Sequence, residues 1–218
     1  MSLIFIQTVC LFYIITAPFE TTTSTSSTST TTSTTSSTTT STSTTRTTST
    51  TTTTPAPPCL PTSLGSLGSL GTVGTIYSTT SDIGSSYKCF AYEWISPTTR
   101  LVTLAFQFQH DPDYWYLDDV SVYEGATQKL INGDFETGSL SPWIKTTPNG
   151  NCIEIINGLS SIWPRNGAYS FYDGTRGCAD QISQNFTVSA DRLYRISFWL
   201  KSGSSGSGYP VSAKVTLS

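Results

Sequence analysis

The chain has few charged residues and no stretch with apolar residues at helical spacing over a useful length. Only 11% of its 218 residues are Asp, Glu, Lys or Arg, and the net charge is −3 with a pI near 5.0. Nucleic-acid-binding proteins normally carry a basic surface, so we expect no nucleic-acid partner. The missing helical pattern argues against an α-helical fold.

Histidine is scarce as well, which limits the available chemistry. His110 is the single histidine and no G-x-S-x-G motif accompanies it, so nucleophilic catalysis has no support. The run HDPD, residues 110–113, predicts a turn in which the Asp-Pro step sets the bend. A zinc site is disfavoured because the cysteines are far apart and only His110 could join them. We therefore expect no enzymatic activity.

The first residues are apolar and predict entry into the secretory pathway. Residues Leu3 to Ala17 form an apolar run that is short for a spanning helix and typical of a signal-peptide core. Residues 1–17 are therefore predicted to be a signal peptide. An uncleaved membrane anchor is the alternative, because no Lys or Arg precedes the run and Pro18 follows it. A membrane is an expected partner only in that case.

A Ser/Thr tract follows. From Thr21 to Thr54 every residue except Arg46 is Ser or Thr, so the tract has nothing apolar to bury and is not expected to fold. We interpret residues 18–58 as a mucin-like, O-glycosylated stalk. Together with the leader, this predicts a secreted, extracellular or cell-surface protein.

Beyond the stalk, four stretches alternate apolar and polar residues, which predicts strands with one buried face. The expected inward residues are Val102, Leu104, Phe106 and Phe108; Ile182, Gln184, Phe186 and Val188; Tyr194, Ile196, Phe198 and Leu200; and Val211, Ala213, Val215 and Leu217. Gly- and Asn-containing turns separate the stretches, so the predicted fold is all-β, an antiparallel β-sandwich. The same phase turns Asn185 outward, within the sequon Asn-Phe-Thr, which predicts N-glycosylation there.

The stretch from Tyr114 to Glu136 is less regular. Trp115 and Leu117 share one face of an ideal strand, whereas Val120 and Val122 share the other. All four reach one core only if an extra residue is inserted, which predicts a β-bulge at the two aspartates between them. The following LINGDFE run, residues 130–136, is predicted to be a second strand after a short loop that contains a glycine.

Four carboxylates in this short stretch suggest a cation. They repel one another unless solvent or a positive ion intervenes, and calcium prefers oxygen ligands. The candidate metal ligands are Asp118, Asp119, Asp134 and Glu136. Two alternatives stay open: a solvated acidic edge, and a carboxylate pair that hydrolyses a glycosidic bond.

Two motifs resemble a known family. NGDFETGSLSPW, residues 132–143, resembles the opening strand and loop of carbohydrate-binding modules with the galactose-binding-like jelly-roll fold. YWYLDDVSVYE, residues 114–124, resembles the closing strand of the same family. The resemblance implies a glycan ligand and a structural calcium where these strands meet, with Glu136 and either Asp118 or Asp119 as ligands.

The two motifs occur in reverse order. Residues 59–124 therefore resemble the C-terminal half of a jelly-roll module, and residues 125–218 the N-terminal half of another. Two incomplete modules are one explanation. One permuted sandwich is the other, because the first and last strands of such folds are neighbours and a short hairpin could join them.

Four cysteines remain after Cys10 leaves with the signal peptide, which favours disulfides in a secreted chain. Three pairings are possible. We favour Cys59–Cys89 and Cys152–Cys178, because each is local to its own half of the chain.

Aromatic residues near polar donors suggest the binding of a sugar. Trp199 falls on the polar face of its strand, while Trp163 and Tyr172 lie in or near loops with Arg176 and Asn149. Flat rings offer a surface for stacking, and amide and guanidinium groups offer partners for hydroxyls. These residues are the candidate ligand-binding set, for glycans or glycoproteins. The alternatives are that the aromatics are core, that the protein is a structural or adhesive matrix protein, or that it is an accessory region of a glycoside hydrolase.

Overall fold

A computed structural model describes residues 55–64, 74–204 and 208–218, and these form strands and turns with no helix. The described ranges accordingly contain no helix that could cross a membrane. The predicted signal peptide and the Ser/Thr tract to Thr54 lie outside them. The strands are β1 (Thr62–Ser63), β2 (Gly74–Thr79), β3 (Lys88–Ile95), β4 (Arg100–His110), β5 (Trp115–Glu124), β6 (Thr127–Gln128), β7 (Ile144–Thr146), β8 (Asn157–Ser160), β9 (Ser170–Asp173), β10 (Asp180–Val188), β11 (Leu193–Ser202) and β12 (Val211–Leu217).

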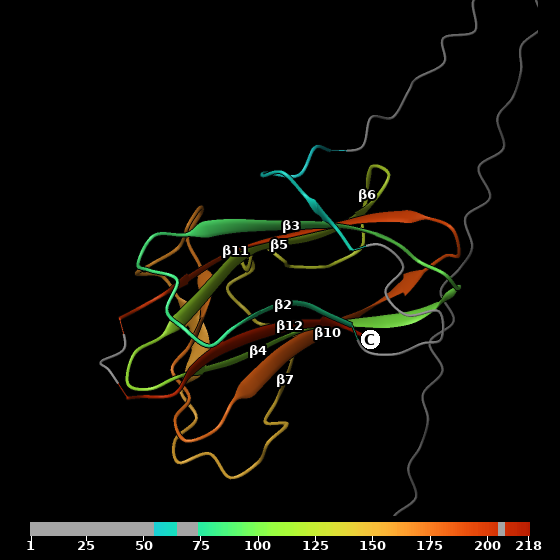
Figure 1. Cartoon of the computed structure of the whole chain (residues 1–218). Helices are drawn as coiled ribbons and strands as arrows, with labels where there is room; N and C mark the ends of the chain where they lie inside the picture. The colour runs from blue at the N-terminus through green and yellow to red at the C-terminus, as the bar shows by residue number, and fades with distance from the viewer. Residues whose placement is uncertain (1–54, 65–73, 205–207) are drawn as a thin grey trace, which may run out of the picture. The chain divides into compact units, whose positions relative to one another are not determined.

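The strands pack as two sheets, which confirms the predicted β-sandwich. Sheet A has the order β1-β3-β11-β5-β9-β8. The short strand β6 pairs with the C-terminal end of β5, whereas β9 pairs with its N-terminal end. Sheet B has the order β2-β12-β4-β10-β7. Only the short β1–β3 pair is parallel among these pairings. Figure 1 shows β3, β11 and β5 as one layer facing β2, β12, β4 and β10.

The core lies between the sheets and follows the alternation in the sequence. All the predicted inward residues of β4, β10, β11 and β12 are buried, with Val211 partly so. Asn185 is exposed on β10, as its phase predicts, and its side-chain oxygen accepts a hydrogen bond from Thr103 Oγ1 at 2.8 Å. Alternation of side chains across a strand therefore accounts for both the core and the outer faces.

The two halves of the chain are interleaved in both sheets. The half from 59 to 124 contributes β1 to β5, and the half from 125 to 218 contributes β6 to β12. In sheet A, β11 lies between β3 and β5; in sheet B, β12 lies between β2 and β4. Neither half has a complete sheet, and together they form one sandwich.

The predicted bulge is present in β5. Ser121 pairs with Ser197 and Asp118 with Trp199, so β5 places two residues where β11 places one. Asp119 adopts the left-handed conformation with a φ of 48°, which aspartate tolerates better than most residues. The insertion keeps the core-facing side chains buried on both sides of the bulge: Trp115, Leu117, Val120 and Val122.

The predicted strand over residues 130–136 is wrong, because this segment forms turns. The hairpin strand ends at Gln128, whose Oε1 accepts the backbone N–H of Val122 at 2.9 Å, Lys129 at 3.0 Å and Leu130 at 3.3 Å. The side chain thus takes the place of a backbone acceptor for Val122, and the last backbone bond of the hairpin runs from the Lys129 N–H to the Val122 carbonyl at 2.8 Å. Alternation alone could not reveal this local competition.

The NGDFE segment instead anchors a loop in the core. Asn132 and Phe135 have positive φ angles of 55° and 60°, which are incompatible with a strand. Phe135 is fully buried against Trp143 and Phe171, with ring centroids 5.7 and 6.2 Å away. Trp143 in turn donates from Nε1 to the carbonyl of Asn132 at 2.9 Å.

Both predicted disulfides are present, Cys59–Cys89 and Cys152–Cys178. The first ties the N-terminal segment to β3, and the second closes the loop before β10. Two such bonds indicate that the protein folds in an oxidising environment.

Candidate functional site

Asp118 in the β5 bulge is fully buried and binds a loop from the other half of the chain. Its carboxylate accepts the backbone N–H of Arg165 at 2.8 Å, of Asn166 at 3.4 Å and of Asp119 at 2.8 Å. Burial raises the pKa of Asp118 to about 6, against the opposing effect of these hydrogen bonds. The bulge therefore aims a carboxylate at backbone donors.

Glu136 holds the other end of the same loop, residues 165–169. Its carboxylate accepts the N–H of Ala168 at 2.8 Å and of Tyr169 at 3.0 Å. A Cβ at Gly167, where φ is 68°, would lie 2.3 Å from the Glu136 carboxyl carbon, so a larger residue would strain the backbone and displace Glu136. The two family-like motifs thus supply the two carboxylates that position one loop.

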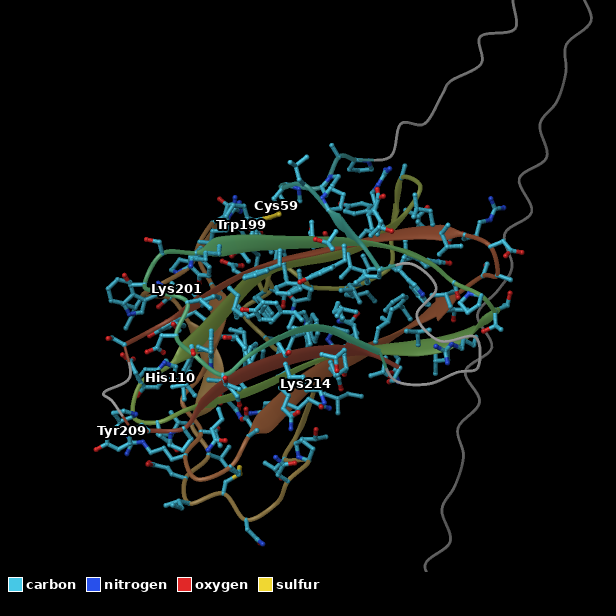
Figure 2. All side chains as sticks on the ribbon, viewed as in Figure 1. Cys59, His110, Trp199, Lys201, Tyr209 and Lys214 are labelled. Carbon is cyan, nitrogen blue, oxygen red and sulfur yellow. A yellow bond between two sulfur atoms is a disulfide. The ribbon has the colours of Figure 1, made fainter. Side chains whose placement is uncertain are left out.

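The side chain of Arg165 connects this loop to the outer face of sheet A. Arg165 pairs with Asp119, and its guanidinium carbon lies 3.9 Å from the ring centroid of Trp199. Trp199 therefore faces outward, as predicted, with one indole face covered by the guanidinium. These residues and Asp134 line a shallow cavity of about 470 Å³. Figure 2 shows Trp199 near Cys59 on the sheet A layer.

The four carboxylates predicted as calcium ligands have separate partners in the protein. Asp118 and Glu136 accept loop N–H groups, Asp119 pairs with Arg165, and Asp134 is exposed and accepts the N–H of Glu136 at 3.4 Å. Within the described ranges, no three His, Cys, Asp or Glu side chains are arranged to hold a metal ion. Calcium at this corner stays a prediction of the resemblance.

A second group of side chains lies further along the outer face of sheet A, around Lys201. Register places Lys201 of β11 opposite Tyr116 of β5. The ammonium lies 4.7 Å from the ring centroids of Tyr116 and Trp163 and 4.8 Å from that of Tyr87. Tyr87 donates its hydroxyl to the Trp163 carbonyl at 2.8 Å, which joins the segment before β3 to the loop after β8. We call these four residues the Lys201 cage.

Two cavities open beside the Lys201 cage, and both are lined by Tyr114, Tyr116 and Trp163. The larger, about 430 Å³, extends over β8 to Tyr172. The smaller, about 300 Å³, reaches Lys201 itself. The rings of Tyr114 and Tyr172 meet edge to face with centroids 5.9 Å apart. Together the rings form a continuous aromatic surface with hydroxyl groups along it, suited to a flat polar ligand.

The residues predicted to bind a glycan do not lie at one site. Trp163 and Tyr172 line the 430 Å³ cavity, and Trp199 lines the separate cavity near Asp119. Arg176 pairs with Glu154 at 3.5 Å, close to the second disulfide. Asn149 is exposed in a turn closed by the N–H of the next residue. Neither Arg176 nor Asn149 is among the residues that line these three cavities.

A second pair of aspartates is buried where sequence analysis did not place a site. Asp173 of β9 and Asp180 of β10 are 0% and 2% exposed. Thr175 donates its N–H to Asp173 at 3.1 Å and its hydroxyl to Asp180 at 2.9 Å. One oxygen of each aspartate has no donor among the described residues. Burial, the charge of Asp180 and the side chain of Asp180 as a hydrogen-bond neighbour raise the pKa of Asp173 to about 9, which favours its protonated form.

His110 is a buried core residue at the end of β4. Its Nε2 lies 2.7 Å from Asp82 Oδ1, and its ring packs edge-on against Trp115. The bend predicted after it is present at Asp111–Asp113. No serine or cysteine nucleophile contacts His110 among the hydrogen bonds of the described chain.

Sequence reasoning missed Lys201 and the three tyrosines nearest to it, Tyr87, Tyr114 and Tyr116. One signal was available. Tyr116 alternates with the buried Trp115 and Leu117, so it had to face outward from sheet A. The register of β5 against β11, which places Tyr116 beside Lys201, depends on the bulge and could not be read from spacing.

No family model, curated protein or solved structure matches the chain.

Proposed function

We propose that the protein is an extracellular carbohydrate-binding module without catalytic activity, displayed on the mucin-like stalk. Glycans or glycoproteins are its ligands, and the aromatic surface beside the Lys201 cage is the binding site. The observation that carries the proposal is that Trp163, with 53% of its surface exposed, lines one cavity with the partly exposed Tyr114, Tyr116 and Tyr172. Aromatic side chains that are exposed together on a protein surface often form a binding site for a ligand or a partner.

Several features support the proposal. The resemblance of the NGDFE and LDDVSV motifs to galactose-binding-like modules implies the same ligand class. The two disulfides agree with secretion. Among the residues that line the two cavities, Asp113 is the single carboxylate, whereas glycosidic hydrolysis normally requires two. Binding without hydrolysis is the function that this chemistry favours.

Adhesion to a protein partner is the second candidate. Ile153 and Ile155 flank the second disulfide loop and are 85% and 61% exposed, and Ile162 next to Trp163 is 75% exposed. Exposed apolar side chains of this kind also occur at protein interfaces. Binding of a protein ligand that survives loss of Trp163 would favour this function.

A glycan array probed with the full chain, disulfides intact, tests the proposal. We expect specific binding, and about tenfold weaker binding for Trp163→Ala and Tyr172→Ala because each removes a stacking face. Tyr209→Ser is the matched control, since Tyr209 is 57% exposed and lines neither cavity. The proposal is wrong if folded protein binds no glycan, or if binding persists unchanged in both aromatic variants.

A further inference from the structure

We infer that the Lys201 cage receives the carboxylate of an acidic sugar, a uronic or sialic acid residue. This inference rests on the proposed function and narrows its ligand class. It starts from an unusual lysine: Lys201 is 8% exposed, although lysine side chains normally reach solvent. On the outer face of β11 three aromatic rings surround its ammonium, and none of the ion pairs in the described part of the chain includes it.

The ammonium of Lys201 has unused hydrogen-bond donors. Its three contacts are to ring faces at 4.7–4.8 Å, and no oxygen of the described residues accepts a hydrogen bond or forms an ion pair with it. Burial accordingly lowers the pKa of Lys201. Ring faces attract a cation but leave its N–H groups free for a stronger acceptor. Because Lys201 lines the 300 Å³ cavity, a molecule bound in the cavity can supply that acceptor.

The one carboxylate in this cavity does not serve as the acceptor. Asp113 accepts the backbone N–H of Tyr114 at 2.9 Å and of Ser204 at 2.8 Å, and Gly203 leaves room for it. Its two oxygens are therefore committed to the loop that follows β11. Asp113 positions this loop at the cavity wall and leaves Lys201 unpaired.

The tyrosines around Lys201 add no negative charge. Burial raises the pKa values of Tyr87 and Tyr116, so both stay neutral at physiological pH. The cavity thus combines a cation on a largely buried side chain with flat rings. An ion pair formed there is stronger than one at an open surface, because less water screens it. A pyranose that carries a carboxylate supplies both a face for Tyr116 or Trp163 and a partner for the ammonium.

Matched pairs of ligands test the inference. We would titrate the full chain with sialylated and desialylated N-glycans, with oligogalacturonates and their methyl esters, and with glucuronate- and glucose-terminated oligosaccharides. We expect the acidic member of at least one pair to bind about tenfold more tightly, and this preference to weaken at high salt.

Substitution of Lys201 then identifies the group responsible. Lys201→Met keeps most of the length of the side chain and removes its charge, so the acidic and the neutral member of a pair should bind with nearly equal affinity. Lys201→Arg should preserve the preference. Lys214→Met is the control, because Lys214 is exposed on β12 of the opposite sheet, as Figure 2 shows.

The outcomes separate the two proposals. Equal binding of acidic and neutral partners, reduced by Trp163→Ala, overturns the inference and leaves the proposed function standing. An acidic preference that survives Lys201→Met also overturns it. No binding of any ligand by folded protein overturns both.

Discussion

The molecule contains two pairs of aspartates whose surroundings are opposite. Asp118 and Asp119 are adjacent in sequence, and each is matched by donors from the Arg165 loop. Asp173 and Asp180 come together only in the fold, and each keeps one buried oxygen that no described donor reaches. In the first pair both carboxylates have donors as partners. In the second pair, a proton on one of the two carboxylates would provide the donor that these oxygens lack.

The difference shows that the spacing of acidic residues in the sequence is a poor guide to which carboxylates repel each other in the fold. The bulge separates the two neighbouring side chains, so that Asp118 points to backbone N–H groups and Asp119 to a guanidinium. Asp173 and Asp180, on strands of different sheets, are buried, where charge is costly and repulsion is poorly screened. Burial and donors, more than spacing, decide which carboxylates are strained.

Asp118→Ala is expected to have the largest effect on stability. It removes the acceptor for three backbone N–H groups, of which Arg165 and Asn166 belong to the other half of the chain. Leaving buried donors unpaired should lower the free energy of unfolding by about 3 kcal/mol in urea denaturation. Asp134→Ala, on an exposed carboxylate, is the control. A loss under 1 kcal/mol would contradict the role given to the bulge.

Asp173→Asn is expected to stabilise the protein at high pH. The folded pKa near 9 exceeds the ordinary value of 3.8, so the folded state binds the extra proton between these values. The contribution of Asp173 to stability is therefore full below about pH 4 and is lost as pH rises towards 9.

Asparagine at position 173 keeps the acceptor for Thr175 and carries no charge. The variant should lose this pH dependence and gain on the order of 1–2 kcal/mol at pH 8, measured by denaturation at several pH values. Parallel pH profiles for the variant and the parent protein would show that the two aspartates are not coupled.

Removal of calcium is expected to have a moderate effect. If the ion predicted by the resemblance binds near Glu136 and Asp118, chelation should lower the unfolding temperature by a few degrees, because bound ligand stabilises the folded state. The effect is limited because both carboxylates already accept N–H groups from the 165–169 loop. An unfolding temperature that is unchanged by chelator and by added calcium would show that the folded protein binds no calcium.

Asp119→Asn, which suits the left-handed backbone at this position, is expected to have the smallest effect. The ion pair with Arg165 is partly exposed, with 24% and 32% of the two side chains accessible, so its loss should cost less than about 1 kcal/mol. Arg165 keeps its stacking on Trp199. A loss as large as that of Asp118→Ala would mean that the two aspartates act as one unit, which a double variant would reveal.

The sequence predicted most of the fold because its strands alternate clearly. The inward residues of β4 and β11 are those expected, and the fault in the alternation of β5 located the bulge. Locality predicted both disulfides. These features depend on side-chain periodicity or on short separations along the chain.

The features that the sequence did not predict depend on contacts between residues that are distant in the chain. The turns at residues 130–136 follow from the Gln128 side chain and from burial of Phe135, which no local pattern shows. The Lys201 cage takes Tyr87 from before β3, Tyr116 from β5 and Trp163 from the loop after β8. Spacing could not bring these together, since the register across sheets is a tertiary property.

Because strands of the two halves alternate in both sheets, the protein should tolerate division into two fragments that assemble without a covalent link. The exposed Gly125–Ala126 turn connects them, and each disulfide lies within its own half. Cleavage at this turn would leave two chains that share no covalent bond and complete each other's sheets, so they should dissociate only on unfolding. Expressed apart, the two fragments should fold by complementation, and the aromatic surface would exist only in the reassembled pair.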